Sequence, residues 1–107
     1  MSAIRQLSAP ELKAMLERGD ALELVDVRTP EERDIARIDG STLLDQAELE
    51  RLMALDKQTL IVFQCHHGMR SQSAAEYFQR AGFENLCNLA GGIDEWSALV
   101  DRSVARY

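Results

Sequence analysis

The sequence predicts an α/β fold: a doubly wound, mainly parallel sheet of about five strands, with helices on both faces. Short apolar segments with strand character alternate with amphipathic helical segments along almost the whole chain. A helix between consecutive strands is the connection that parallel strands need. Ligands bind at the carboxyl ends of the strands in such sheets. We therefore expect any functional site at the ends of the predicted strands.

The first predicted elements are a short strand and a well-capped helix. Residues 4–7 form the strand. Ser8 and Glu11 follow with the spacing of a capping box, in which each satisfies a backbone N–H at the helix start. Apolar residues then recur at helical spacing, and Gly19 is a natural helix end. The helix is therefore expected between the capping box and this glycine.

A core strand and a brief helix are predicted next. The segment ALELV, residues 21–25, is short and mostly apolar, and it ends at Asp26. Thr29 and Pro30 suit the N-cap and the first position of a short helix. A turn then leads into a short strand over residues 42–44.

The second half of the chain repeats the alternation of helix and strand. Its predicted elements are helix 45–55, strand 59–64, helix 71–80, strand 85–89 and helix 93–100. Cys87 and Trp96 are expected in the core. The AGG sequence at 90–92 predicts a flexible turn, and the terminal SVARY at 103–107 is expected to be loosely held.

Length and composition predict one domain covering residues 1–107. The net charge of -6 argues against a general nucleic-acid binder. No apolar run approaches the roughly 20 residues that span a bilayer, and no secretory signal is visible. Two cysteines make no disulfide framework. We expect a cytoplasmic protein with free cysteines and with neither a membrane nor a nucleic-acid partner.

The segment CHHGMRS at 65–71 follows the strongest predicted strand and carries the candidate chemistry. Cys65 would stand at the N-terminus of the next helix, whose free N–H groups and partial positive charge favour a thiolate. Arg70 is a candidate fork for an oxyanion, and His66 and His67 are further candidates for positive charge. Core packing does not explain this loop, so we predict a nucleophile. No metal site is expected, because adjacent ligands rarely share one tetrahedral metal.

Four ordered segments resemble the motifs of single-domain rhodaneses, a family of sulfurtransferases, and together they cover almost all of the chain. They are DVRTPEE at 26–32, IARIDGS at 35–41, CHHGMRS at 65–71 and NLAGGIDEW at 88–96. The second departs from the family's HIPGA pattern, because Arg37, Asp39 and Ser41 replace its histidine, proline and alanine. We expect that turn to differ in detail.

The resemblance implies a rhodanese-like fold and a thiosulfate sulfurtransferase that works through a persulfide. Cys65 would take the outer sulfur of thiosulfate or another sulfane donor, and cyanide or a thiol would then remove it. Asp26 and Arg28 would give structural support, Arg70 would help to bind the donor, and no cofactor is implied. The loop residues expected to bind the donor and stabilise the persulfide are His66, His67, Gly68, Met69, Arg70 and Ser71.

Two alternatives to the sulfurtransferase hypothesis remain open. Cysteine phosphatases of the dual-specificity cell-cycle kind share the architecture but use Cys-x5-Arg. Here only four residues separate Cys65 from Arg70, and Ser71 takes the place of the phosphatase arginine. The shorter loop would enclose a smaller anion site, which favours sulfur over phosphate. A sulfur-carrier or docking module that receives persulfide from a donor protein, or passes it to an acceptor protein, is the second alternative.

Overall fold

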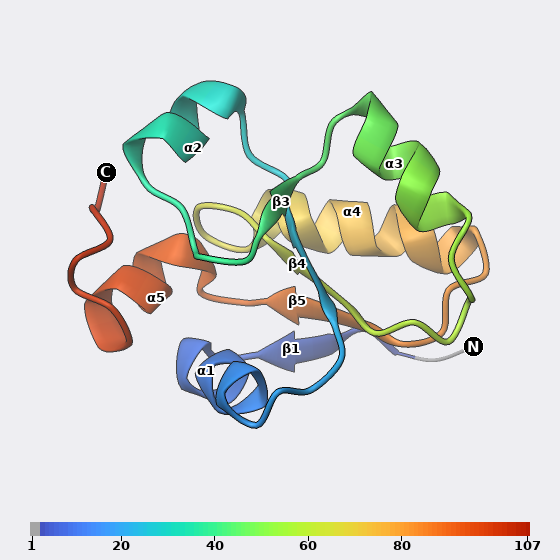
Figure 1. Cartoon of the computed structure of the whole chain (residues 1–107), viewed down its shortest axis with the longest axis horizontal. Coiled ribbons are helices and arrows are strands. Elements are labelled where there is room, and N and C mark those ends of the chain that lie inside the picture. The colour runs from blue at the N-terminus through green and yellow to red at the C-terminus, as the bar shows by residue number, and fades with distance from the viewer. Residues whose placement is uncertain (1–2) are drawn as a thin grey trace.

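Within residues 3–107, which the computed structural model describes, five strands form one parallel sheet (Figure 1). Its spatial order is β1–β5–β4–β2–β3, and each neighbouring pair runs parallel. The strands are β1 (Arg5–Leu7), β2 (Glu23–Asp26), β3 (Thr42–Leu43), β4 (Ile61–Gln64) and β5 (Leu86–Leu89). The predicted α/β class is confirmed.

Helices cover both faces of this sheet. They are α1 (Ala9–Glu17), α2 (Pro30–Ile35), α3 (Gln46–Met53), α4 (Met69–Arg80) and α5 (Gly92–Leu99). Helices α1 and α5 pack together on one face, whereas α3 and α4 cover the other (Figure 1). Helix α2, the loop after β4 and the C-terminal segment gather at the carboxyl end of the sheet.

The helix starts follow the sequence signals closely. The predicted capping box of Ser8 and Glu11 is present at α1, and Thr29, the predicted N-cap of α2, forms a second capping box with Glu32. Helix α4 begins at Met69 rather than at residue 71, because the preceding glycine already serves as its N-cap. Strand boundaries are tighter than predicted, since a strand begins only where its residues pair with a neighbour.

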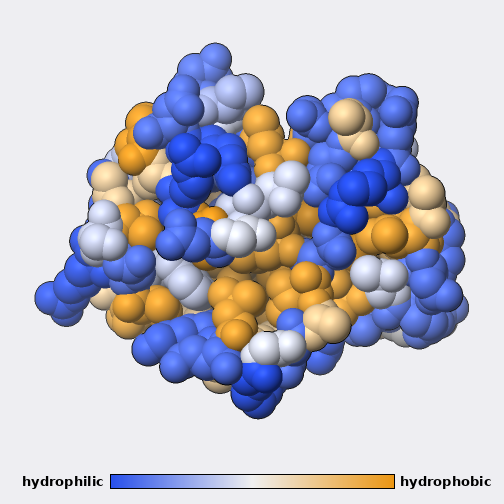
Figure 2. Space-filling model, in the orientation of Figure 1, coloured by the Kyte–Doolittle hydropathy of each residue, from blue (hydrophilic) through white to orange (hydrophobic). Residues whose placement is uncertain are grey.

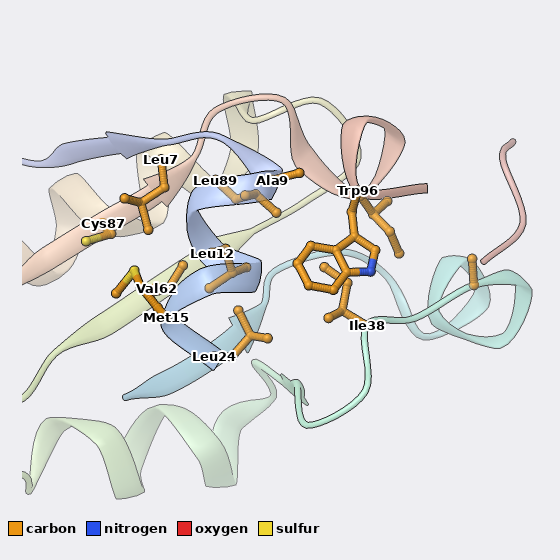
Figure 3. Close-up of a cluster of buried hydrophobic side chains, with 12 residues drawn as sticks. Leu7, Ala9, Leu12, Met15, Leu24, Ile38, Val62, Cys87, Leu89 and Trp96 are labelled. Atoms are coloured by element: carbon orange, nitrogen blue, oxygen red, sulfur yellow. The ribbon is translucent and has the colours of Figure 1, made fainter. Parts of the chain in front are cut away.

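One core cluster lies between the sheet and helices α1 and α5 (Figure 3). Leu12 of α1 is fully buried there, next to Val62 of β4 in the same cluster. Cys87 and Trp96 also belong to this cluster, which confirms both predicted core positions. Burial of a side chain the size of Leu12 contributes about 1.5–3 kcal/mol to the free energy of unfolding.

The outward surfaces of the helices are largely polar, although Ile35, Tyr77 and Leu99 are exposed on them. In Figure 2, hydrophilic residues cover α2 and α3, and apolar surface lies between them. No helix within residues 3–107 is long and apolar enough to cross a membrane.

A buried ion-pair network closes the carboxyl end of β2. Arg28 donates two hydrogen bonds to the carboxylate of Asp26, at 2.9 and 2.8 Å, and both side chains are fully buried. Arg33 adds a third bond at 3.0 Å and also donates to the hydroxyl and the carbonyl of Ser41. Burial alone would raise the pKa of Asp26, but the bonds from Arg28 and Arg33 outweigh it and lower that pKa.

The serine that replaces the family's alanine is therefore satisfied within this network. The hydroxyl of Ser41 accepts from Arg33 at 2.9 Å and donates to the carbonyl of Ile38 at 2.6 Å. A buried hydroxyl without such partners would be costly. Ser41 is thus a polar anchor of this turn.

The C-terminal segment is held in place, contrary to the prediction that it is loose. Ser97 donates from its hydroxyl to the carbonyl of Val104, and Arg106 forms a two-point ion pair with Asp94 at 3.1 Å. The phenol of Tyr107 accepts a hydrogen bond from a buried arginine at 2.9 Å. Val104 also packs against the core cluster on the side of α1 and α5. These anchors are single residues rather than a periodic pattern, so hydrophobic periodicity does not predict them.

We expect Asp26→Asn to destabilise the protein by about 3–5 kcal/mol, because it leaves two guanidinium groups without their buried counter-charge. Urea unfolding at pH 7 measures this loss. Since the pKa of Asp26 is lowered in the folded state, its contribution is present above about pH 4 and fades as the pH falls through that lowered pKa.

The matched control is Asp20→Asn, which removes a largely exposed ion pair with Arg18. Its cost should stay under about 1 kcal/mol. Equal losses in the two variants would show that burial of the Asp26 network adds nothing.

Candidate active site

Cys65 is the first residue after β4, and its side chain is enclosed by the loop that follows. The residue is 1 % exposed. Its Sγ lies 3.1 Å from the backbone nitrogen of Gly68 and 3.4 Å from that of Ser71, and both N–H groups donate to it. The Ser71 hydroxyl lies 3.2 Å from the same sulfur. The N-terminus of α4 thus surrounds the thiol with donors, as the sequence predicted.

Two glycines allow the loop to take this shape. Gly68 has a φ of +98°, and a Cβ there would lie 2.1 Å from the carbonyl oxygen of Ala90. Gly92 has a φ of +62°, and its Cβ would lie 2.2 Å from the carbonyl oxygen of His66. The 90–92 turn predicted to be flexible is therefore a site of close backbone contact, where only glycine fits.

The start of α5 is fastened to the same loop. The N–H of Ile93 donates to the carbonyl of Cys65 at 2.8 Å, and that of Asp94 donates to the carbonyl of His66 at 3.2 Å. Free N–H groups of one helix start therefore orient the carbonyls of the loop. The loop's own N–H groups are left to face the sulfur.

Asn88 joins the site from β5 and was not among the predicted site residues. Its side-chain oxygen accepts from the Ser71 hydroxyl at 2.5 Å, and its amide nitrogen donates to the carbonyl of Gly68 at 3.1 Å and to Gln6 at 2.9 Å. The Ser71 hydroxyl has one proton, which serves either Asn88 or a thiolate on Cys65. A polar residue at the end of a buried strand was the signal available in the sequence.

The two cysteines have opposite electrostatic environments. Burial would raise the pKa of the Cys65 thiol, but hydrogen bonds from the hydroxyl and the N–H of Ser71 and from the N–H of Gly68 lower it below its ordinary value. Burial raises the pKa of Cys87, which lies in the apolar core. Only Cys65 is therefore poised to ionise.

Arg70 is paired with a carboxylate of α2 in this structure. Its guanidinium forms two parallel hydrogen bonds with the carboxylate of Glu32, at 2.7 and 2.9 Å. Tyr107 donates from its phenol to the same carboxylate at 2.7 Å. Sequence reasoning missed Glu32 and Tyr107, because these contacts join positions 38 and 75 residues apart.

The paired histidines form a ring stack at the mouth of the site. The ring of His66 lies 3.9 Å from that of His67 and 3.9 Å from that of Tyr107, measured between centroids. Met69 is 81 % exposed at the rim. A pocket of about 360 Å³ opens here, lined by Cys65, His66, His67, Met69 and Arg70.

Asp26 and Arg28 lie behind the site. Arg28 donates to the carbonyls of Glu32 and Ala36, at 3.4 and 2.7 Å, and to the phenol of Tyr107. The pair thus supports α2 and the C-terminal segment, which in turn border the pocket. No group of three or more His, Cys, Asp or Glu side chains among residues 3–107 is arranged to hold a metal ion.

The family model for the Rhodanese-like domain matches residues 8–99. Thiosulfate sulfurtransferase GlpE of Pseudomonas entomophila is 38 % identical to this chain, over 90 % of it and 87 % of GlpE. "Probable adenylyltransferase/sulfurtransferase MoeZ" of Mycobacterium tuberculosis is 35 % identical over 91 % of the chain. The chain spans only 26 % of that longer relative.

A solved structure extends the comparison to the fold. The human single-domain sulfurtransferase TSTD1 superposes with a TM-score of 0.75 at 26 % identity, covering 91 % of this chain and 98 % of that one. The family match spans all five helices and four of the five strands described above, together with the loop around Cys65. The chain therefore belongs to the Rhodanese-like domain family.

Proposed function

We propose that the protein is a sulfurtransferase that carries a sulfane sulfur as a persulfide on Cys65. The observation that supports this most directly is the convergence of two backbone N–H groups and one hydroxyl on Sγ. Such donors lower the pKa of the thiol and stabilise negative charge on the sulfur. The activity in the names of the GlpE relatives adds thiosulfate as a candidate donor.

The reaction would proceed in two displacement steps. The Cys65 thiolate attacks the outer sulfur of thiosulfate, a new S–S bond forms, and the old S–S bond breaks so that sulfite leaves with the bonding electron pair. A thiolate or cyanide acceptor then attacks the outer sulfur of the persulfide, and Cys65 leaves as the thiolate. Each step keeps a negative charge within reach of the N–H groups of Gly68 and Ser71.

The geometry of the loop also supports sulfur rather than phosphate as the transferred group. Ser71 occupies the position of the phosphatase arginine, and its side chain points inward to Sγ and to Asn88. Ser71 has no positive charge with which to bind a phosphate group. Activity toward a generic aryl phosphate is therefore not expected.

Incubation with thiosulfate should add one sulfur atom, about 32 Da, to Cys65, because the proposed chemistry is covalent. Intact-protein mass spectrometry followed by peptide mapping measures the adduct and its position. Cyanide should then remove the added mass and yield thiocyanate.

The control is Cys65→Ala, which keeps Cys87 as the second thiol. An adduct of equal size in this variant, or none in the unaltered protein with any sulfane donor, would rule out the proposed chemistry.

Cys65 should react with iodoacetamide along a pH profile whose midpoint lies below about 8.5, the ordinary value for a free cysteine. Ser71→Ala should move that midpoint upward, because it removes the hydroxyl that stabilises the thiolate. Alkylation rates between pH 5 and 10 measure both curves. Cys87, with its raised pKa and full burial, should stay unmodified and so provides an internal control. A midpoint that Ser71→Ala leaves unchanged would contradict this role.

A further inference from the structure

We propose that Glu32 is a specificity-determining residue of this site. Its carboxylate is bound to the guanidinium of Arg70 and so neutralises the positive charge at the mouth of the site. The site would therefore bind doubly charged sulfur donors less well than persulfides of lower charge. This inference rests on the proposed sulfur transfer and names the class of donor that the site prefers.

The first support is the geometry of the pair. The two bonds from Arg70 to Glu32 are short and parallel, which is the bidentate arrangement that a guanidinium offers to carboxylates and other oxyanions. The fork that would hold two oxygens of thiosulfate is therefore already filled. A donor that uses Arg70 must first displace this carboxylate.

The second support is the anchoring of Glu32, which does not depend on Arg70. Its carboxylate accepts from the backbone N–H of Thr29 at 3.2 Å, as the closing half of the capping box of α2. It also accepts from the phenol of Tyr107 at 2.7 Å. The Arg70 guanidinium, together with the Tyr107 and Thr29 bonds, holds the pKa of Glu32 far below its usual range, so the group is ionised at neutral pH.

The third support is the charge balance at the mouth. Arg70 lines the pocket over Cys65, yet its charge is matched there by one fixed carboxylate. Arg106, the neighbour in sequence of the Tyr107 that stacks on His66, is likewise paired, with Asp94. A dianion that approaches Cys65 thus meets two arginines that are each already paired with a carboxylate. The negative charge of the Cys65 thiolate repels it as well. A persulfide with one negative charge or none meets less repulsion.

The test is Glu32→Gln. Glutamine also serves as the third residue of a capping box, so α2 should keep its N-terminus while Arg70 loses its counter-charge. The KM for thiosulfate should fall about three- to tenfold, a modest factor because the Arg70 side chain is half-exposed and screened. We expect kcat to stay within about twofold, and the KM for the persulfide of 2-mercaptoethanol to move less than that for thiosulfate.

Two further variants separate this effect from general ones. Glu31→Gln removes one negative charge from an exposed position on the same turn and should leave the thiosulfate KM unchanged. The double variant Glu32→Gln/Arg70→Gln restores a neutral mouth and should return the KM close to that of the unaltered protein. Added salt should erase the gain in Glu32→Gln, because an exposed cation is screened within about 10 Å at 0.1 M.

A second readout does not depend on sulfur transfer. Iodoacetate is anionic and iodoacetamide is neutral, and both alkylate the Cys65 thiolate. The rate constant for iodoacetate divided by that for iodoacetamide should rise several-fold in Glu32→Gln. In the double variant this ratio should return to the value of the unaltered protein. If this shift occurs while no donor loads Cys65 with sulfur, the proposed function fails and the charge effect stands. If sulfur transfer proceeds but neither the ratio nor the thiosulfate KM changes, or if Glu31→Gln changes them equally, the role of Glu32 is overturned.

Discussion

The close contact between the loop after β4 and the start of α5 is the constraint on which the site depends. Gly92 lets the α5 backbone approach the loop, and the N–H groups of Ile93 and Asp94 take up the carbonyls of Cys65 and His66. With those carbonyls directed at the start of α5, N–H groups of the loop can face the sulfur. A side chain in place of Gly92 would separate the two segments and remove the ring of donors.

Glu32 connects the fold with the site more directly than any predicted site residue. One carboxylate closes the capping box of α2, receives the Tyr107 phenol and pairs with Arg70. The same ion therefore stabilises a helix start, holds the C-terminal segment and sets the charge at the mouth. A residue with a clear structural role in the sequence can have a second role that only its neighbours reveal.

Local patterns in the sequence were sufficient for the order and type of the elements. The capping box at Ser8, the N-cap at Thr29 and the apolar run before Cys65 depend on residues within a few positions of one another. The exact ends of the strands could not be predicted as well, because a parallel strand begins where its residues pair with the neighbouring strand. Glu23 of β2, for example, pairs with Ile61 of β4. The prediction of a loose C-terminus was wrong, because its anchors are individual polar and apolar contacts without periodicity.

The sequence by itself determined the α/β class, the family resemblance and the position of Cys65 after the strongest strand, because these depend on short-range order along the chain. Only the tertiary structure decided which side chains contact the loop residues that follow Cys65. Arg70 meets Glu32, Ser71 meets Asn88, and His66 stacks on Tyr107, all across long separations in sequence. The carboxyl edge of a parallel sheet collects loops from distant parts of the chain. Which charges and rings meet at that edge is therefore a property of the folded molecule.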